Sequence, residues 1–489
     1  MRTFIGRREE LGALAEVFDS PRSEFRMIRG RRRIGKTRLL TEATKERTDT
    51  LFFSGAEDVT SDKKNRERIC EKLADFAKDD ILKAARGLSW NSIFEKIVEF
   101  AKDRQNLIII FDEIQWIARQ GSGFLSDLKE AWTRLFQPSG KIKIIICGSS
   151  SKFFEHKSSG PESVLHKLRT MSDIWLKPMT LRETSQFCKG WNHQEIVLTQ
   201  MMFGGVPYYL DLIISPERGF VQCVNDIAFT SKTIFFDEVV ETLKLDISST
   251  TRAIQILSVI GQDGKTLKQM SEGALLSAST VDELVEKLAD YGVLYKQYPL
   301  GLQPKENDFG MKYFIADEFL NFYFNVLDKE QRAIKSNGSG RLLFKSVFKE
   351  GYYIKNFTGK AFELVIRKII KGGINAPINK KLSVGNLEKY EVGSFWKTSG
   401  SNGNQIDLVV SSDEDRCTRL VEAKWTNKKV GAEPNNAIEQ VLSKDYPNPK
   451  KHKINRFVVS SSGFTSEAVS FASKNQVGLI ELDDLFDRI

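Results

Sequence analysis

The chain has 489 residues and a formal net charge of +9, with 41% hydrophobic and 28% charged residues. No run of about eighteen apolar residues occurs, which excludes a membrane-spanning helix, and the length suits about three domains. The N-terminal segment lacks the apolar core of a signal peptide, and five scattered cysteines show no metal-binding spacing, so we expect a cytoplasmic protein. The positive charge is compatible with a nucleic-acid partner but does not demonstrate one.

The first motif is a phosphate-binding loop, Gly30-Arg31-Arg32-Arg33-Ile34-Gly35-Lys36-Thr37, which fits the pattern G-x-x-x-x-G-K-[ST]. The two glycines let backbone N–H groups turn toward phosphate oxygens. Lys36 brings a positive charge to the β- and γ-phosphates, and Thr37 offers a hydroxyl to Mg²⁺. A strand pattern at 25–28 and a helix start at 38–43 flank the loop, and the positive end of that helix favours an anion. We therefore predict ATP binding here rather than a glycine-rich turn that binds nothing.

Two buried strand patterns follow, and each ends in polar residues. The first, residues 107–113, ends in Asp112 and Glu113; we expect Asp112 to hold Mg²⁺ and Glu113 to orient and activate the attacking water. The alternative is a strand that merely ends in solvated acids. The second, residues 142–147, leads to Ser149, our first choice for a group that senses the γ-phosphate, with Ser150 second and a plain turn as the alternative. Strands separated by helices predict an α/β fold with a parallel sheet. Arg169 is a candidate transition-state arginine by its position in the chain alone.

The middle of the chain reads as helical. A Gly-Gly-Val-Pro sequence at 204–207 marks a sharp bend, which suits a helical lid over the nucleotide or a structural corner. Three helix patterns between 253 and 288, followed by two strand patterns, predict a winged helix. Its third helix is acidic over 279–290, which argues against DNA reading. We expect a P-loop ATPase core at 1–180, a lid at 181–245, a winged helix at 246–327, a linker at 328–345 and a nuclease-like domain at 346–489.

A second constellation of charged residues lies near the C-terminus. Asp407 lies on a predicted strand, and Glu422 and Lys424, two residues apart, project from one face of the next strand. Together with Glu363 on a preceding helix, they match the PD-(D/E)xK nucleases. We expect Glu363, Asp407 and Glu422 to bind a second divalent ion, Mg²⁺ or Mn²⁺, and Lys424 to position a water. The alternative is a salt-bridged hairpin. Supporting features are a basic segment at 450–453 and the aromatic residues Phe395 and Trp396, each of which also suits a loop or a core.

The chain as a whole resembles the archaeal-type P-loop ATPases of the AAA+/STAND-like group, which carry a winged helix and a C-terminal nuclease-like domain of unknown function. The resemblance rests on Phe4-Ile5-Gly6-Arg7, residues 30–37, Phe111-Asp112-Glu113 with Trp132, Cys147-Gly148-Ser149-Ser150, Gly204-Gly205-Val206-Pro207-Tyr208-Tyr209-Leu210, Tyr313-Phe314-Ile315-Ala316-Asp317 with Phe319-Leu320 and Phe322, and Ile406-Asp407 with Glu422-Ala423-Lys424-Trp425. It implies that the segment at 4–7 contacts the adenine. Two departures are His166-Lys167-Leu168-Arg169 in place of a Tyr-Gly-Arg-like element, and Gln405 where an acid often precedes the Ile-Asp pair.

These features together predict an Mg²⁺-dependent ATPase, an ATP hydrolase, whose nucleotide state regulates a metal-dependent nuclease or a nucleic-acid-binding domain. DNA or RNA is the expected partner, no membrane is expected, and assembly into a homo-oligomer is left open. The alternative is a signalling or scaffolding switch with slow hydrolysis and a degenerate nuclease fold. The acidic helix at 279–290 and Gln405 favour that alternative.

Overall fold

The computed structural model describes residues 3–85, 87–119, 121–149, 153–154, 173–215, 217–244, 247, 249–301, 310–337, 357–372, 376–385, 387–396, 405–433, 436–443 and 446–486. They form two compact units, Met1–Pro178 and Met179–Ile489. Each unit has its own buried core.

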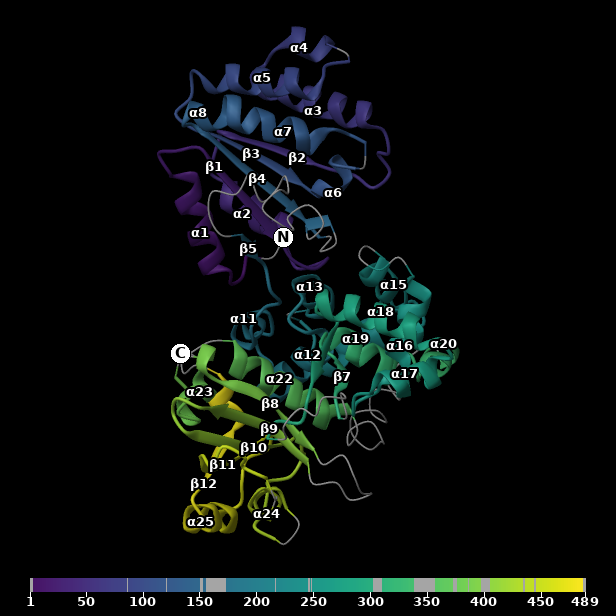
Figure 1. Cartoon of the computed structure of the whole chain (residues 1–489), viewed down its shortest axis with the longest axis vertical. Coiled ribbons are helices and arrows are strands. Elements are labelled where there is room, and N and C mark those ends of the chain that lie inside the picture. Colours follow the sequence, from purple (N-terminus) through teal and green to yellow (C-terminus); the bar gives the residue numbers. More distant parts are fainter. Residues whose placement is uncertain are drawn as a thin grey trace. The chain divides into compact units, whose positions relative to one another are not determined.

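A five-stranded parallel sheet forms the centre of the first unit (Figure 1), with the strand order β2-β3-β4-β1-β5. The strands are β1 (Glu24–Arg29), β2 (Thr50–Ser54), β3 (Leu107–Asp112), β4 (Ile142–Gly148) and β5 (Ile174–Trp175). Strands β3 and β4 are buried along their whole length, as branched apolar runs are in a parallel sheet covered on both faces. Parallel pairing brings the carboxyl ends of β1, β3 and β4 to one edge of the sheet, where α/β folds bind ligands.

Helices cover both faces of this sheet (Figure 1), and the side chains of β3 alternate between two cores. Ile109 and Phe111 enter the core shared with α3, α5 and α7, whereas Ile108 and Ile110 enter the core shared with α1 and α2. The helices of the unit are α1 (Arg8–Phe18), α2 (Lys36–Thr44), α3 (Asp62–Ala77), α4 (Asp80–Ala84), α5 (Trp90–Ala101), α6 (Ile114–Ile117), α7 (Phe124–Ala131), the π-helical turn η1 (Trp132–Phe136) and α8 (Gln137–Ser139).

The second unit begins with a helical segment, as the sequence predicts. Its helices are α11 (Leu181–Phe187), α12 (His193–Phe203), α13 (Pro207–Ile213), α14 (Phe220–Ala228) and α15 (Phe235–Lys244). The sharp bend expected between α12 and α13 is present: Gly204 and Gly205 have φ angles of 62° and 66°, and Pro207 opens α13. Met201 of α12 belongs to the same buried core as Phe362 near the C-terminus, so this helical segment is packed with the last domain.

Three helices and an antiparallel hairpin follow, in the order that the sequence predicts. They are α16 (Thr250–Ile260), α17 (Leu267–Ala274), α18 (Ala278–Asp290), β6 (Leu294–Gln297) and β7 (Lys312–Ile315). The aromatic segment after the hairpin forms α19 (Glu318–Phe322), the π-helical turn η2 (Tyr323–Leu327) and α20 (Gln331–Asn337). Phe319 and Phe322 are fully buried, so the aromatic residues of this segment pack in a core.

The C-terminal part of the unit is a mixed five-stranded sheet of order β12-β11-β10-β9-β8 with helices around it. Its elements are α22 (Gly359–Lys371), α23 (Pro377–Lys381), η5 (Leu387–Lys389), β8 (Glu391–Trp396), β9 (Gln405–Ser412), β10 (Cys417–Lys424), α24 (Ala437–Ser443), β11 (Lys453–Ser460), α25 (Ser466–Lys474), β12 (Val477–Glu481) and η6 (Leu482–Leu485). Strand β9 pairs antiparallel with β8 and β10, whereas β10, β11 and β12 are parallel.

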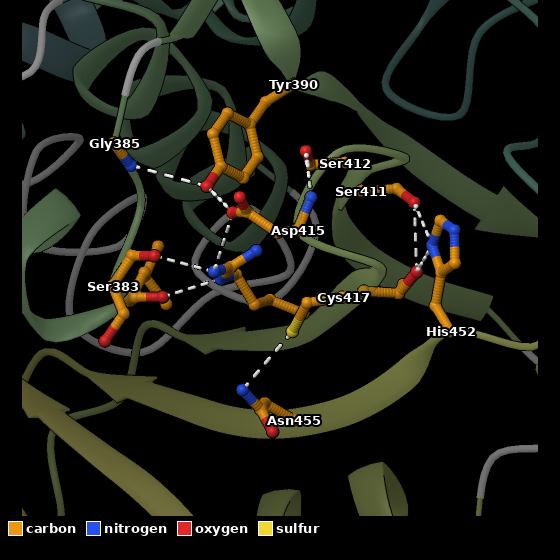
Figure 2. A network of polar contacts seen from close by, with 12 residues as sticks. Ser383, Gly385, Tyr390, Ser411, Ser412, Asp415, Cys417, His452 and Asn455 are labelled. Carbon is orange, nitrogen blue, oxygen red and sulfur yellow. Dashed lines mark hydrogen bonds and ion pairs between the residues drawn. The ribbon is translucent and has the colours of Figure 1, made fainter.

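A buried arginine fastens the beginning of β10 (Figure 2). Arg419 is 4% exposed, and its Nε and Nη2 donate to the carbonyl oxygens of Leu382 and Ser383 at the end of α23, each over 2.6 Å. The Asp415 carboxylate lies 3.6 Å from Arg419 Nη2 and also accepts a hydrogen bond from Tyr390. Because the buried charge is paired and hydrogen-bonded, it holds β10 against α23.

Among the described helices, none combines the length and the apolar character that crossing a bilayer requires.

Candidate functional site

The phosphate-binding loop lies between β1 and α2. Gly35 has a φ of 89°, a left-handed value that favours glycine, and α2 begins at the next residue. Gly30 has no room for a side chain, because a Cβ there would lie 2.5 Å from the carbonyl oxygen of Leu176. The two motif glycines are therefore needed for different reasons. Gly35 allows the backbone to turn, and Gly30 leaves space for the segment that follows β5.

The Lys36 side chain lies within this loop. It is 5% exposed, and its Nζ donates to the carbonyl oxygens of Gly30 and Arg31 over 2.8 and 2.9 Å. The ammonium group and the N-terminus of α2 both carry positive charge at the same place. The loop therefore offers the elements that an anionic phosphate group requires.

Thr37 and Asp112 meet at the carboxyl end of β3. Thr37 Oγ1 donates to Asp112 Oδ2 over 2.7 Å, and Asp112 Oδ1 accepts from the backbone N–H of Glu113 over 3.0 Å. Asp112 is 1% exposed. A hydroxyl oxygen beside a carboxylate oxygen is a donor set that suits Mg²⁺, so the residues present fit the ion that the sequence pattern implies.

Glu113 is held in a constrained geometry next to this pair. Its φ is 49°, a left-handed value that is uncommon for a residue with a side chain. Glu113 Oε2 accepts from Ser149 Oγ over 3.1 Å and also from the Gln115 amide, whose Nε2 lies 3.4 Å from Ser149 Oγ. The structure thus brings two of the candidate residues, Glu113 and Ser149, together. Gln115 was missed, since its only signal is its place two residues after Glu113.

The rest of the loop is arranged around Ile34, which is fully buried. Its carbonyl oxygen accepts from Nη2 of Arg7 over 3.4 Å, and Arg7 is itself 5% exposed. The intervening residues Arg31, Arg32 and Arg33 complete the loop, and Arg33 has a left-handed φ of 71°. The predicted Arg169, and Ser150 as the second sensor choice, lie outside the described residues.

The predicted nuclease residues come from α22, β9 and β10 of the second unit. Glu363 of α22 and Asp407 of β9 share one lysine: Lys360 Nζ lies 2.8 Å from the Glu363 carboxylate and 3.9 Å from Asp407 Oδ1. Asp407 Oδ2 accepts from the backbone N–H of Ala423 over 3.0 Å, which ties β9 to β10 at this point. Lys360 was missed by sequence reasoning, although it lies one helical turn before Glu363.

An irregularity in β9 gives Asp407 its position. Leu408 and Val410 enter the core that contains α22, whereas Ile406 and Val409 enter the core on the other face. The regular alternation therefore slips between Ile406 and Val409, and the pairing of β8 with β9 shifts register at the same place. Such a bulge redirects a side chain. Here Asp407 faces Lys360 and Glu363 on the helix side of the sheet.

Glu422 and Lys424 form a second ion pair beside the first. Lys424 Nζ donates to Glu422 Oε1 over 2.8 Å, and Glu422 is 2% exposed. Burial raises the pKa of the Glu363 carboxyl well above its usual range, and Asp407 adds to this, although Lys360 opposes it. Burial lowers the pKa of Lys424, but Glu422 and Asp407 outweigh this effect and leave it raised. Three acids and two lysines thus form one interacting cluster.

The cluster is ion-paired rather than arranged as a metal cage. Its carboxylate oxygens suit a hard divalent cation in chemical type. Among the residues that the structure describes, however, no three His, Cys, Asp or Glu side chains group closely enough to hold a metal ion. The ammonium group of Lys360 supplies the positive charge between Glu363 and Asp407 instead. In this arrangement the three acids do not fit the metal that the nuclease pattern implies.

The cluster opens into a cavity of about 480 Å³ whose other wall is the β6–β7 hairpin. The hairpin is fixed to the C-terminal sheet: Gln297 Nε2 of β6 and the backbone N–H of Leu300 both donate to the carbonyl oxygen of Ser394 in β8, over 3.3 and 2.9 Å. Arg367 of α22 donates to Gln297 from the other side. Of the acids in the cluster, Glu363 and Asp407 line this cavity. The segment predicted as a winged helix therefore contributes a wall to the predicted nuclease site.

The supporting features at the C-terminus divide into two kinds. Trp396 lines the cavity, whereas Phe395 is fully buried in a core. In the basic segment, Lys450 pairs with Asp413 over 2.8 Å. His452 is buried, and its Nδ1 lies 3.3 Å from Ser411 Oγ (Figure 2), which indicates a packing role for this residue.

Two family models match parts of this chain. Residues 4–213 match an ATPase domain predominantly from Archaea, and residues 379–489 match a restriction endonuclease. An uncharacterized protein of Methanocaldococcus jannaschii is 26% identical over 87% of this chain and 88% of its own.

Among solved structures, a Walker-type ATPase of Pyrococcus abyssi has a TM-score of 0.50 at 18% identity, covering 66% of this chain and 96% of that one. The ORC2 protein of Aeropyrum pernix has a TM-score of 0.47 at 14% identity, covering 68% and 98%. The first of these likenesses concerns the fold alone. The resemblance and the α/β fold drawn from the sequence are confirmed: the chain carries an archaeal-type ATPase domain and a restriction-endonuclease-like domain.

Proposed function

We propose that the chain is an ATP hydrolase whose nucleotide state governs a C-terminal domain that binds and cleaves nucleic acid. One observation carries the coupling between the two activities. Leu176 donates its N–H to the carbonyl oxygen of Arg29, directly before the phosphate-binding loop, over 2.8 Å. Met179 donates its N–H to the carbonyl oxygen of Gly205, also over 2.8 Å. Only two residues, Lys177 and Pro178, separate these anchors, so the chain that connects the two units is short.

In the proposed ATPase, Lys36 and the loop amides bind the β- and γ-phosphates, and Thr37 and Asp112 hold Mg²⁺, which neutralises phosphate charge when bound. Glu113 orients the attacking water and accepts its proton. Ser149, within hydrogen-bond reach of Glu113, reports the presence of the γ-phosphate. Arg169 is proposed as the transition-state arginine from its place in the chain alone.

In the proposed nuclease, Lys360 and Lys424 are the cations that meet the anionic phosphodiester, and the carboxylates beside them accept a proton from water. Burial strengthens these charge interactions, because the surrounding medium screens them less than water does. The three helices and the hairpin from α16 to β7 are proposed to be a winged helix that walls this site. On α18, Glu286 accepts from Tyr313 of the hairpin over 3.1 Å, whereas Glu283 forms an exposed pair with Lys287 of the same helix over 2.5 Å. The contact between Glu286 and the hairpin supports an internal role for α18.

The coupling is tested by lengthening the connection. A Gly-Gly-Ser insertion between Lys177 and Pro178 should leave ATP hydrolysis within about two-fold of the parent, because no loop residue changes. The same insertion should abolish the dependence of nucleic-acid binding and cleavage on ATP. Both activities are measured on a panel of single- and double-stranded DNA and RNA, with Mg²⁺ or Mn²⁺. If the insertion variant keeps its full response to ATP, the proposed coupling is wrong.

A switch without cleavage is the second candidate function. The observation that favours it is the ion-paired cluster, in which Lys360 lies between the two carboxylates that a metal would need. In that case ATP would change assembly, and nucleic acid would not be cut. Asp407→Ala distinguishes the two: cleavage that this variant loses establishes a nuclease, whereas ATP-dependent assembly without cleavage in either protein establishes the switch.

A further inference from the structure

The cavity beside the predicted nuclease site contains polar groups that have no partner in the part of the chain that the structure describes. Gln262, in the turn after α16, lines the cavity, and both polar atoms of its side chain, Oε1 and Nε2, are buried without a hydrogen bond. Trp396 also lines it, is 9% exposed, and its Nε1–H likewise lacks an acceptor. Buried polar groups are nearly always satisfied, so two donor groups and an acceptor left unpaired in one cavity indicate a missing polar ligand.

Aromatic faces form the second feature of this cavity. Phe314 of β7 contacts both of its aromatic neighbours: its ring centroid lies 5.2 Å from that of Tyr295, at 13°, and 6.0 Å from that of Trp396, at 65°. All three rings line the cavity. The wall formed by the hairpin and β8 therefore offers flat apolar surface close to the unpaired polar atoms.

Charge is the third feature. Lys312 lies with its Nζ 5.5 Å from the centre of the Trp396 ring, and Lys360 and Arg367 add two more cations to the lining. The carboxylates of Glu363 and Asp407 lie at the same end as Lys360. A ligand of this cavity therefore meets a flat apolar wall, an amide that both donates and accepts, and cations beside the cluster.

We propose that the cavity takes one unpaired nucleotide of a single-stranded nucleic acid, with its base against the Phe314 and Trp396 wall and its phosphate toward Lys360. A nucleobase supplies a flat π-face for the aromatic wall and an edge with donors and acceptors for Gln262. Its phosphate supplies the anion. In a duplex the same edge is paired and the same face is stacked on neighbouring bases, so a duplex cannot offer them. The cavity volume lies within the range of about 300–1,000 Å³ that small-molecule sites have.

This inference rests on the proposed function, because it names the substrate class of the same site, yet binding and cleavage are separable. Binding is measured in EDTA by fluorescence anisotropy of an internally labelled single-stranded 12-nucleotide DNA, at a salt concentration that weakens general phosphate contacts. The competitors are the blunt duplex of the same length and a free mononucleotide. The single strand should bind about 10-fold more tightly than the duplex.

Three uncharged substitutions locate the binding. Gln262→Ala and Trp396→Phe should each weaken single-strand binding about 3- to 10-fold and leave duplex binding unchanged, since neither alters the net charge. Gln255→Ala, an exposed glutamine on α16, is the matched control and should change nothing. Trp396→Phe keeps an aromatic ring and should therefore fold. If Gln262→Ala does not fold, Trp396→Phe still tests the inference.

Equal affinity for single strand and duplex, or two cavity variants that bind like the parent, would overturn the inference. A free mononucleotide that competes as well as the oligonucleotide would overturn the assignment to a strand and identify a free nucleotide as the ligand. Cleavage without single-strand preference would leave the nuclease proposal standing and remove this one. If the cavity variants lose the single-strand preference but none of the proteins cleaves nucleic acid, the present inference stands and the nuclease proposal is wrong.

Discussion

Replacing Lys360 with methionine tests whether the C-terminal cluster is a balanced set of charges. Lys360 Nζ lies 2.8 Å from Glu363 and 3.9 Å from Asp407. At an effective dielectric constant of about 20, these separations correspond to attractions of about 6 and 4 kcal/mol, much of which desolvation offsets. Removing one partner of a buried pair leaves the other charge uncompensated, which typically costs about 3–5 kcal/mol. We therefore expect Lys360→Met to lower the free energy of unfolding by about that amount at pH 8 in EDTA.

Calorimetric unfolding measures this effect, as a fall of about 10 °C in the Tm of the transition that contains the second unit. Lys371→Met is the matched control, because Lys371 is exposed on the same helix and pairs with no carboxylate among the residues that the structure describes. It should shift the Tm by less than about 2 °C. A divalent ion can replace the missing positive charge, so Mn²⁺ should restore part of the lost Tm in Lys360→Met and affect the parent less. If Lys360→Met unfolds at the parent's Tm in EDTA, or if Mn²⁺ stabilises both proteins equally, Lys360 does not balance the charges of this cluster.

The same variant has a defined pH dependence. Burial raises the pKa of Glu363, and the loss of Lys360 removes the positive charge that opposes this rise. In the variant, the Glu363 carboxyl therefore becomes uncharged at a higher pH than usual. The stability that the neutral carboxyl gives is present at low pH and is lost as the pH rises through the folded-state pKa. The Tm difference between parent and Lys360→Met should therefore be smaller at pH 5 than at pH 8, and an unchanged difference would contradict the assignment. Lys36→Ala should reduce ATP turnover to background in a phosphate-release assay; undiminished turnover would remove the phosphate-loop assignment. Arg419→Met should cost about 3 kcal/mol in chemical denaturation, because Asp415 and two carbonyl groups lose their partner; a cost below about 1 kcal/mol would show that this network is not structural. The insertion between Lys177 and Pro178 should leave the rate of ATP turnover unchanged and remove the dependence of nucleic-acid binding on ATP; both are measured in the parent and the insertion variant.

The sequence by itself determined the ATPase part of this protein in most respects. A phosphate loop needs its two glycines, lysine and threonine at fixed spacing, because the backbone must curl directly before a helix, and the acids of Asp112 and Glu113 must follow a buried strand. These constraints are local, so they can be read from consecutive residues. Parallel pairing then brings the ends of β1 and β3 together, as the alternation of strands and helices predicts.

The tertiary structure alone decided the composition of the C-terminal site. Its acids were read from the strands, but nothing in the sequence near Asp407 indicates that the alternation slips there, since a bulge depends on how β8 and β9 pair. Lys360 and Gln262 reach the site from elements about fifty and about one hundred and fifty residues away from Asp407. Both residues reach the site because the hairpin packs against β8 and α22. A site that is assembled from separate helices and strands leaves no periodic pattern in the sequence of any one of them.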